Sequence, residues 1–212
     1  MNFPNALYLG LLFLSFILSF KSLKYDKSMR IFPLLLFLSL TTEAIVYLMF
    51  FALEKKPQFY VIYHIYILIE YSLLCYFFQL NTKNSSLRKI IKYSIPLFII
   101  TSTAISIFTG YYIYPGHNLN LAGFLIIIWT TITLFNIEPQ ENLSLFHLPL
   151  FWISIGVLTY YSGSFFFNGV YQYFIENNSE LAKGLNGWIN KGLNYVLYTC
   201  FSIAFICTKH RK

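Results

Sequence analysis

Two long apolar runs joined by a short charged turn decide the fold, and they meet in the segment TTEAIVYLMFFALEKKPQFYVIYHIYILIEYSLLCYFFQL at residues 41–80. With the residues before this segment, the first run covers residues 31–53, and the second covers residues 59–80. Each run has about the 20 residues that a helix needs to cross roughly 30 Å of hydrocarbon. The segment therefore predicts two antiparallel transmembrane helices, with Pro57 in the turn between them.

A glutamate stands near the middle of each run, Glu43 in the first and Glu70 in the second. An ionised side chain near the bilayer midplane is costly, so it normally faces the interior of a helix bundle or a wet cavity and marks a functional site. We expect Glu43 and Glu70 to lie at the same depth and to face each other. Two such carboxyl groups would share a proton, or burial would keep one of them neutral.

The composition indicates a polytopic membrane protein, because 57% of the residues are hydrophobic, 21% are aromatic and only 11% are charged. The apolar runs leave short connections, with no room for a separate soluble catalytic or nucleic-acid-binding domain. We therefore predict one transmembrane domain over residues 1–212, without a cofactor and without direct binding to nucleic acid.

The predicted fold class is all-α, a bundle of seven transmembrane helices. The N-terminal apolar run, residues 7–20, lacks the basic start and the cleavage pattern of a signal peptide, so it is predicted to remain as a helix. The predicted helices cover residues 4–20, 31–53, 59–80, 90–109, 121–135, 149–171 and 188–207. Residues 110–120 are expected to form an outer loop rich in tyrosine, and residues 176–187 a polar loop.

The distribution of basic residues predicts the orientation. The net charge is +7, and most Lys and Arg residues lie in residues 21–30, residues 83–92 and the tail 209–212. Cytoplasmic loops are the ones enriched in Lys and Arg, so we expect the N-terminus outside and the C-terminus inside a bacterial inner membrane. These loops would attract anionic lipid head groups, by about 1 kcal/mol for each basic residue. A second copy of the chain or another protein is the alternative partner for them.

Helical spacing places polar side chains in stripes on four of the predicted helices. The stripes are Ser39, Glu43 and Tyr47; Tyr63, Tyr66 and Glu70; Gly156, Tyr160, Ser164 and Asn168; and Asn186, Asn190, Asn194 and Tyr198. The predicted ligand-binding or proton-binding residues are Glu43, Glu70, Tyr47, Tyr66, Tyr160, Asn168, Asn194 and Tyr198. The alternative is that these groups only bond helix to helix, each contributing about 0.5–2 kcal/mol. Gly156 and Gly163 are expected to allow close helix packing.

No pattern in the sequence indicates a metal centre or a known catalytic motif. The four histidines, His64, His117, His147 and His210, are scattered and form no pair at ligand spacing on one helix face. His64 is expected to point about 120° away from Glu70, toward the face of Tyr71. The three cysteines, Cys75, Cys200 and Cys207, lie inside predicted helices, where we expect small buried apolar groups without a redox role.

Four segments resemble a family of small seven-helix membrane proteins that is abundant in Bacteroidetes bacteria. They are TTEAIVYL at 41–48, YHIYILIEYSLLCYFF at 63–78, FWISIGVLTYYSG at 151–163 and LNYVLYTCFSIAFICTKH at 193–210. That family has no assigned activity, and the resemblance implies an inner-membrane location and a role beside signalling genes. A more remote similarity is to transmembrane accessory proteins encoded beside type VI-B CRISPR effectors, which implies a role in antiviral defence.

Three functions are compatible with these features. The first is a sensor or accessory subunit in which Glu43 and Glu70 form a protonatable or ligand-binding centre. The second is a self-associating channel or pore-forming effector, and the third is an intramembrane enzyme. A closed bundle with both glutamates inside would favour the first, whereas polar stripes that face the common axis of a ring of subunits would favour the second.

Overall fold

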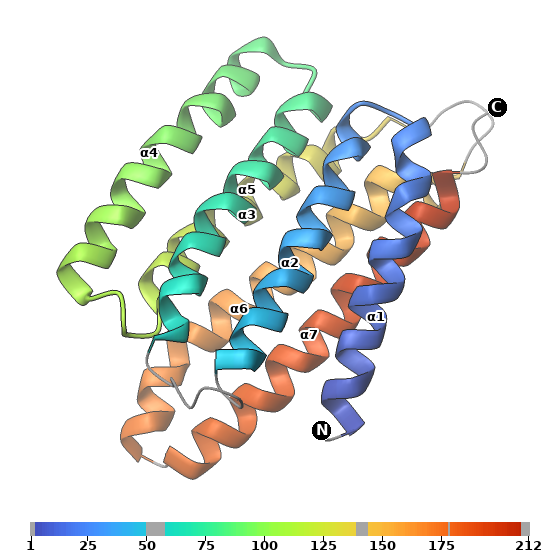
Figure 1. Ribbon diagram of the computed structural model, residues 1–212. Coiled ribbons are helices and arrows are strands. Elements are labelled where there is room, and N and C mark those ends of the chain that lie inside the picture. Colours follow the sequence, from blue (N-terminus) through green and yellow to red (C-terminus); the bar gives the residue numbers. More distant parts are fainter. Residues whose placement is uncertain (1–2, 50–57, 139–143, 178, 209–212) are drawn as a thin grey trace.

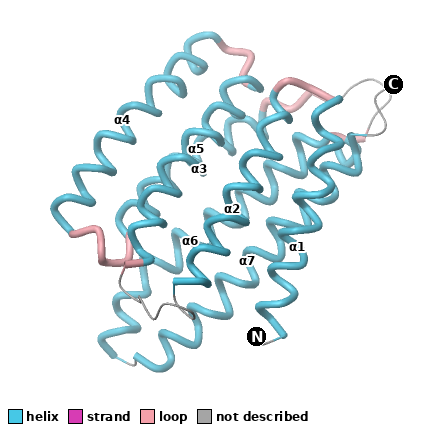
Figure 2. The backbone as a smooth tube through the Cα atoms, in the orientation of Figure 1, coloured by secondary structure: helices cyan, strands magenta, loops and turns pink. Residues whose placement is uncertain are grey.

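The computed structural model describes residues 3–49, 58–138, 144–177 and 179–208, which form seven α-helices and no strand. Short connections join the helices (Figures 1 and 2). The helices are α1 Phe3–Ser19, α2 Phe32–Tyr47, α3 Phe59–Asn81, α4 Ser85–Thr109, α5 Gly116–Phe135, α6 Pro149–Asn177 and α7 Ser179–Cys207. Three short 3-10 turns complete the described chain: η1 Phe20–Lys24, η2 Ser28–Ile31 and η4 Leu145–His147.

Six helices form a closed ring, and α4 lies outside it. Around the ring, α1 packs against α2, α2 against α3, α3 against α5, α5 against α6, α6 against α7, and α7 against α1. The outer helix α4 packs on α3 and α5 (Figure 1). The Tyr71 ring of α3 stacks on Phe98 of α4 with the ring centroids 3.9 Å apart, and the Tyr71 hydroxyl donates to Ser94 Oγ at 3.0 Å. The interior of the ring is therefore bounded by α1, α2, α3, α5, α6 and α7.

Six described helices, α1 to α6, are each long and apolar enough to cross a membrane. Their outer surface carries large apolar side chains that water would not favour; Phe108 is 89% exposed and Phe135 is 85% exposed. The chain is thus a helical membrane protein. Helix α7 is not among the six, and its first half is polar, with Asn190, Lys191 and Asn194 in the sequence.

Close contact between α6 and α7 depends on two glycines, as the sequence predicted. A Cβ added at Gly156 would lie 2.8 Å from Cys200 Cβ, and one added at Gly163 would lie 2.5 Å from Leu193 Cδ2. Real Cβ atoms do not approach other heavy atoms this closely, so a side chain at Gly156 would push the helices apart, and one at Gly163 would displace the end of the Leu193 side chain. This confirms the predicted close packing, and it fixes α7 as a wall of the ring.

Two helices begin earlier than predicted. Helix α4 begins at Ser85 instead of residue 90, because Asn84 Oδ1 caps it by accepting from Ser86 N and Leu87 N. Helix α5 begins at Gly116 instead of residue 121, so the predicted outer loop at 110–120 is wrong in its second half. Its polar first turn packs inside the bundle, where Asn118 is buried, and the helix has 20 residues.

The ends of α2, α6 and α7 also differ from the prediction. The polar segment 176–187, predicted as a loop, is helical in its described residues and belongs to the ends of α6 and α7. Each of these helices has 29 residues, which corresponds to about 43 Å at 1.5 Å per residue. Helix α2 ends at Tyr47, and residues 50–53 of the predicted span lie outside the described residues.

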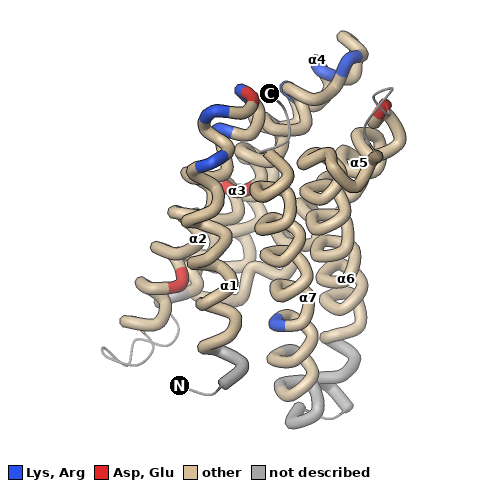
Figure 3. The backbone as a smooth tube through the Cα atoms, turned by 90° about the vertical axis from the view of Figure 1, so that its right-hand side faces the viewer, with Lys and Arg blue, Asp and Glu red and all other residues tan. Residues whose placement is uncertain are grey.

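Most of the Lys and Arg positions lie at one end of the bundle, the end that carries the last turn of α7 (Figure 3). The described basic residues there are Lys21, Lys24, Lys27, Arg30, Lys83, Arg88, Lys89 and Lys92. Glu138 forms an ion pair with Lys83 at this same end. We call it the basic end. The start of α1, the start of α3 and the α4–α5 connection lie at the opposite end (Figure 1).

Candidate functional site

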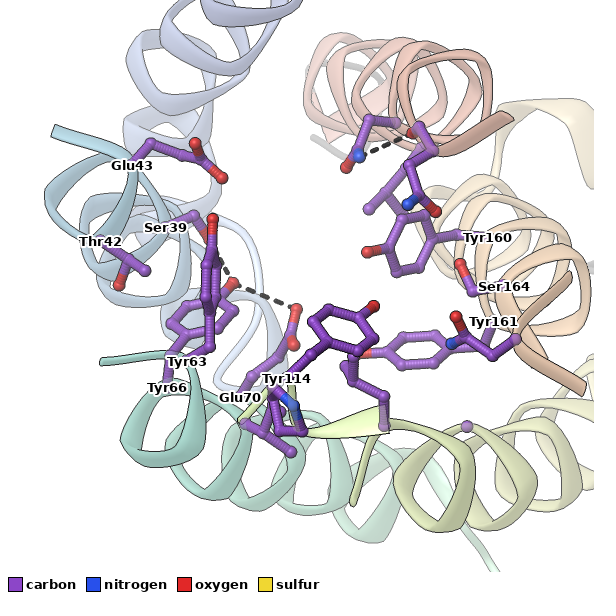
Figure 4. A pocket seen from close by; sticks show the side chains of 18 of the residues that line it. Ser39, Thr42, Glu43, Tyr63, Tyr66, Glu70, Tyr114, Tyr160, Tyr161 and Ser164 are labelled. Carbon is purple, nitrogen blue, oxygen red and sulfur yellow. Dashed lines mark hydrogen bonds between the residues drawn. The ribbon is translucent and has the colours of Figure 1, made fainter. Parts of the chain in front are cut away.

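A polar cavity of about 380 Å³ lies inside the ring of six helices. Eight tyrosines, three asparagines, three hydroxyl residues and two glutamates line it, together with five residues without a polar side-chain group. The lining consists of Tyr8, Ser39, Thr42, Glu43, Tyr60, Tyr63, Tyr66, Ile67, Glu70, Tyr114, Pro115, Leu119, Gly123, Tyr160, Tyr161, Ser164, Asn168, Asn190, Asn194, Leu197 and Tyr198. Every helix of the ring contributes, while no described residue of α4 does. Figure 4 shows Glu43 and Glu70 reaching into the space from one side and Tyr160 from the other.

The cavity extends from the centre of the bundle toward the end opposite the basic end. Glu70 stands at the middle of α3, whereas Tyr60, Pro115 and Asn190 come from parts of the helices and connections near that opposite end. Toward the basic end the interior is filled by an aromatic cluster, Phe32, Phe77, Phe201 and Phe205, in which the Phe32 ring lies 5.1–5.6 Å from the other three. All four side chains are buried. The cavity is therefore blind at the basic end.

Glu70 belongs to a chain of polar groups that crosses from α3 to α2. Its Oε1 atom lies 3.1 Å from the Tyr66 hydroxyl, which lies 2.7 Å from Ser39 Oγ. Ser39 Oγ in turn lies 3.0 Å from the backbone oxygen of Leu35. The Tyr161 hydroxyl of α6 stands beside the same carboxyl group.

Hydroxyl donors face the Glu70 carboxyl group. The Tyr66 hydroxyl donates to Glu70 Oε1, and Ser39 Oγ donates to the backbone oxygen of Leu35. With Tyr161, two phenols thus stand beside the Glu70 carboxyl group.

Glu43 lies in a different part of the cavity, beside the Tyr8 hydroxyl of α1. Among the described hydrogen bonds, none joins Glu43 to Glu70, so the predicted direct pairing of the two carboxyl groups is not supported. The reason is the register between α2 and α3, which is set where Ser39 meets Tyr66. Glu43 comes four residues after Ser39, and Glu70 comes four residues after Tyr66. Because the two helices are antiparallel, these steps of about 6 Å run toward opposite ends of the bundle. Glu70 is therefore deep, and Glu43 is nearer the opposite end.

Seven of the eight predicted site residues line the cavity: Glu43, Glu70, Tyr66, Tyr160, Asn168, Asn194 and Tyr198. Tyr47 does not belong to the lining and is 52% exposed. Each step of four residues turns a helical stripe by about 40°. The stripe that begins at Ser39 faces the cavity, but by Tyr47 it has turned about 80° away. The inclusion of Tyr47 in the predicted site was therefore wrong.

The sequence prediction missed four lining tyrosines: Tyr8, Tyr60, Tyr114 and Tyr161. Tyr8 stands alone on an apolar helix, and Tyr114 lies in a connection that resembled an interfacial belt. Burial raises the pKa of the Tyr114 phenol to about 12, with Tyr171 and Tyr60 adding to the shift. This phenol therefore stays neutral and able to donate at physiological pH. Two signals were available in the sequence. Tyr60 stands three residues before Tyr63 and extends the stripe of Tyr63 and Tyr66, and the adjacent tyrosines at 160–161 could both line only a wide cavity.

His64 lies outside the cavity, in a second polar cluster between α3, α4 and α5. Its Nδ1 atom is 2.8 Å from Ser106 Oγ, and its Nε2 atom donates to the Ile113 backbone oxygen at 3.1 Å. Asn118 Nδ2 donates to Ser106 Oγ at 2.8 Å. Like Tyr71, His64 faces α4, as predicted. This cluster attaches the α4–α5 connection and the first turn of α5 to α3.

Comparison of the chain with protein-family models, with curated proteins and with solved structures finds no match. The resemblance described above therefore stays a prediction. Chemically, the cavity offers two carboxyl groups, phenol and amide groups that both donate and accept, and a volume suited to a small molecule. Among the described residues, no three His, Cys, Asp or Glu side chains come together.

Proposed function

We propose that this protein is a seven-helix inner-membrane sensor or accessory subunit that binds a small molecule in the cavity between Glu43 and Glu70. The N-terminus is outside and the C-terminus inside, so the ligand enters from the outer side. The ligand changes the packing of the ring helices, and the basic cytoplasmic loops pass this change to a partner. The resemblance to proteins encoded near signalling genes or CRISPR effectors agrees with an accessory role.

The observation that carries the proposal is the polar cavity itself. Polar groups inside a membrane protein are costly unless other groups satisfy them. Helix packing alone would be served by side chains in direct contact, whereas here the polar side chains surround about 380 Å³ of space. That volume lies within the usual range for small-molecule sites.

The basic end supports the proposed orientation. Eight described Lys and Arg residues gather there, and cytoplasmic ends of membrane proteins are enriched in these residues. Seven crossings are supported by the six helices that are long and apolar enough to span and by the place of α7, which closes the ring between α1 and α6. An odd number of crossings is consistent with an outer N-terminus and a basic inner C-terminus.

The channel alternative receives less support. A pore formed by several copies would need the polar stripes to face neighbouring subunits, but most of the stripe residues from α2, α3, α6 and α7 line an interior cavity. The Phe32 cluster fills the interior of the bundle between the cavity and the basic end. A blind cavity suits a bound ligand better than a continuous path.

Cysteine accessibility tests the proposal. In a variant without native cysteines, Asn194→Cys places a thiol in the cavity, and Ser154→Cys on α6 places one in the packed core, where Ser154 is 0% exposed. Small membrane-impermeant methanethiosulfonates are then added outside intact cells. We expect the Asn194→Cys thiol to react and the Ser154→Cys thiol to stay unmodified. An unreactive Asn194→Cys thiol would contradict an outward-opening site.

A further inference from the structure

We infer that the ligand of this cavity is a small organic cation, an amine or a quaternary ammonium compound. This inference rests on the proposed function and adds the class of ligand. It is carried by the charges of the lining, by the tyrosines around them and by the size of the cavity.

The first argument is charge. The only side chains of the lining that carry a formal charge when ionised near neutral pH are Glu43 and Glu70, and no Lys, Arg or His is among the described lining residues. The eight described basic residues of the basic end are separated from the cavity by the Phe32 cluster. A bound anion would find no counter-charge, whereas a cation would neutralise a carboxylate that is otherwise costly to ionise.

The second argument is the aromatic lining. Eight tyrosines surround the space, and the faces of tyrosine rings attract cations within about 6 Å of the ring centre. Cages of aromatic side chains bind ammonium groups because the electron-rich ring faces attract the positive charge, and a nearby carboxylate adds to this attraction. The phenol and amide oxygens of Tyr160, Asn168 and Asn194 supply acceptors for an N–H group or a ligand hydroxyl.

The third argument is size. The cavity has about 380 Å³, and a water molecule occupies about 30 Å³ in the liquid, so the space equals roughly a dozen waters. A bare metal ion would leave most of that space unfilled. A small organic cation fills it and reaches the region between the deep Glu70 and the more peripheral Glu43.

The state of the two carboxyl groups couples the ligand to pH. The Tyr66 hydroxyl donates to Glu70 Oε1, and this bond suits a carboxylate that holds a cation. The titratable groups that face this position are Glu43 from α2, Tyr66 from α3, Tyr160 and Tyr161 from α6 and Tyr198 from α7. A carboxylate attracts a cation and a protonated carboxyl group does not, so cation affinity rises with pH.

Two measurements on the purified full chain in lipid nanodiscs test the inference. The first is calorimetric titration with choline and with its uncharged isostere, in which carbon replaces the quaternary nitrogen. Choline is expected to bind about tenfold or more tightly than the isostere, and more tightly at higher pH. Glu70→Gln, which mimics the neutral acid, removes this preference. The matched control Glu138→Gln changes an exposed glutamate of the basic end and leaves choline binding unchanged.

The second measurement compares two impermeant reagents on Asn194→Cys, a trimethylammonioethyl and a sulfonatoethyl methanethiosulfonate. For each reagent, the reaction rate at Asn194→Cys is divided by its rate at Tyr112→Cys, an exposed position in the α4–α5 connection, so that the intrinsic reactivities of the two reagents cancel. A preference of about tenfold or more for the cationic reagent, reduced by Glu43→Gln or Glu70→Gln, supports the inference. Equal normalised rates, or equal binding of choline and its isostere, would overturn the cation while keeping an open cavity. No reaction with either reagent would overturn both proposals.

Discussion

The hydroxyl groups of Ser39 on α2 and Tyr66 on α3 lie 2.7 Å apart, and this contact sets the register of the two glutamate-bearing helices. Tyr66 also reaches Glu70 Oε1 at 3.1 Å. The Tyr66 phenol thus connects the Glu70 carboxyl group to α2. From the level of this contact, Glu43 lies about one helical turn toward the end opposite the basic end, and Glu70 lies about one turn toward the basic end. The two glutamates therefore serve one cavity from two depths.

Removing the Tyr66 hydroxyl tests this bridge. Tyr66→Phe leaves Ser39 and Glu70 without their shared partner, and we expect the free energy of unfolding to fall by about 1–2 kcal/mol. Glu70→Gln keeps a donor at the same place and should cost less. The matched control is Tyr76→Phe on the same helix, because Tyr76 is exposed. Reversible unfolding in mixed micelles measures all three, and equal stability of Tyr66→Phe and the control would show that the bridge contributes nothing.

The glycine contact between α6 and α7 gives a second prediction. Gly156→Ala would bring its Cβ to 2.8 Å from Cys200 Cβ and 3.4 Å from the Leu197 backbone oxygen, so the helices must separate. The expected loss of stability is about 1–3 kcal/mol. Gly169→Ala on the same helix meets no atom within 4 Å and should be neutral or slightly stabilising, because alanine favours helix. Thermal unfolding of the pair checks this, and a Gly156→Ala protein as stable as Gly169→Ala would refute close packing.

The second polar cluster predicts a specific role for Asn118. Asn118→Ala removes the donor to Ser106 Oγ inside a buried cluster and should cost about 1–3 kcal/mol. His117→Ala, one residue earlier and exposed, is the control. Hydrogen exchange of the α5 amides gives a second readout, since the first turn should lose protection in Asn118→Ala. Unchanged protection there would mean that the cluster does not hold α5.

The orientation predicts which loops an impermeant thiol reagent can reach. Ser28, in the first basic loop, is a poor reporter because it is 3% exposed and donates to Asp26 Oδ2 at 3.0 Å. Exposed Lys24 is the better position. With reagent outside intact cells, Tyr112→Cys should react and Lys24→Cys should react only after the membrane is opened. The reverse pattern would place the N-terminus inside.

Much of the fold follows from the sequence because helix-forming apolar runs are local features. The ends of α1 and α3 agree with the prediction within a residue or two, and Gly156 and Gly163 were expected at a close contact. The starts of α4 and α5 were missed because a cap at Asn84 and a buried Asn118 let polar residues enter a helix. Those features depend on contacts between distant parts of the chain.

The candidate site follows from the sequence only in part. Helical spacing identified the stripes of Tyr66 and Glu70 and of Tyr160 and Asn168, because polar residues on one face of an apolar helix avoid lipid. Equal spacing does not reveal register, so it could not tell that Glu43 and Glu70 lie at different depths. Nor could it assign Tyr8, a single polar residue on α1 that the ring brings to Glu43.

The most direct test of the central claim, that the ring of helices holds a small ligand beside its two glutamates, is an experimental structure in lipid nanodiscs with choline present. We expect seven crossing helices and density for a compact molecule between Glu43, Glu70 and Tyr160, separate from the lipid around the bundle. A lipid acyl chain in that space, a collapsed interior, or either glutamate pointing outward into lipid would contradict the account and leave helix packing as the role of both residues.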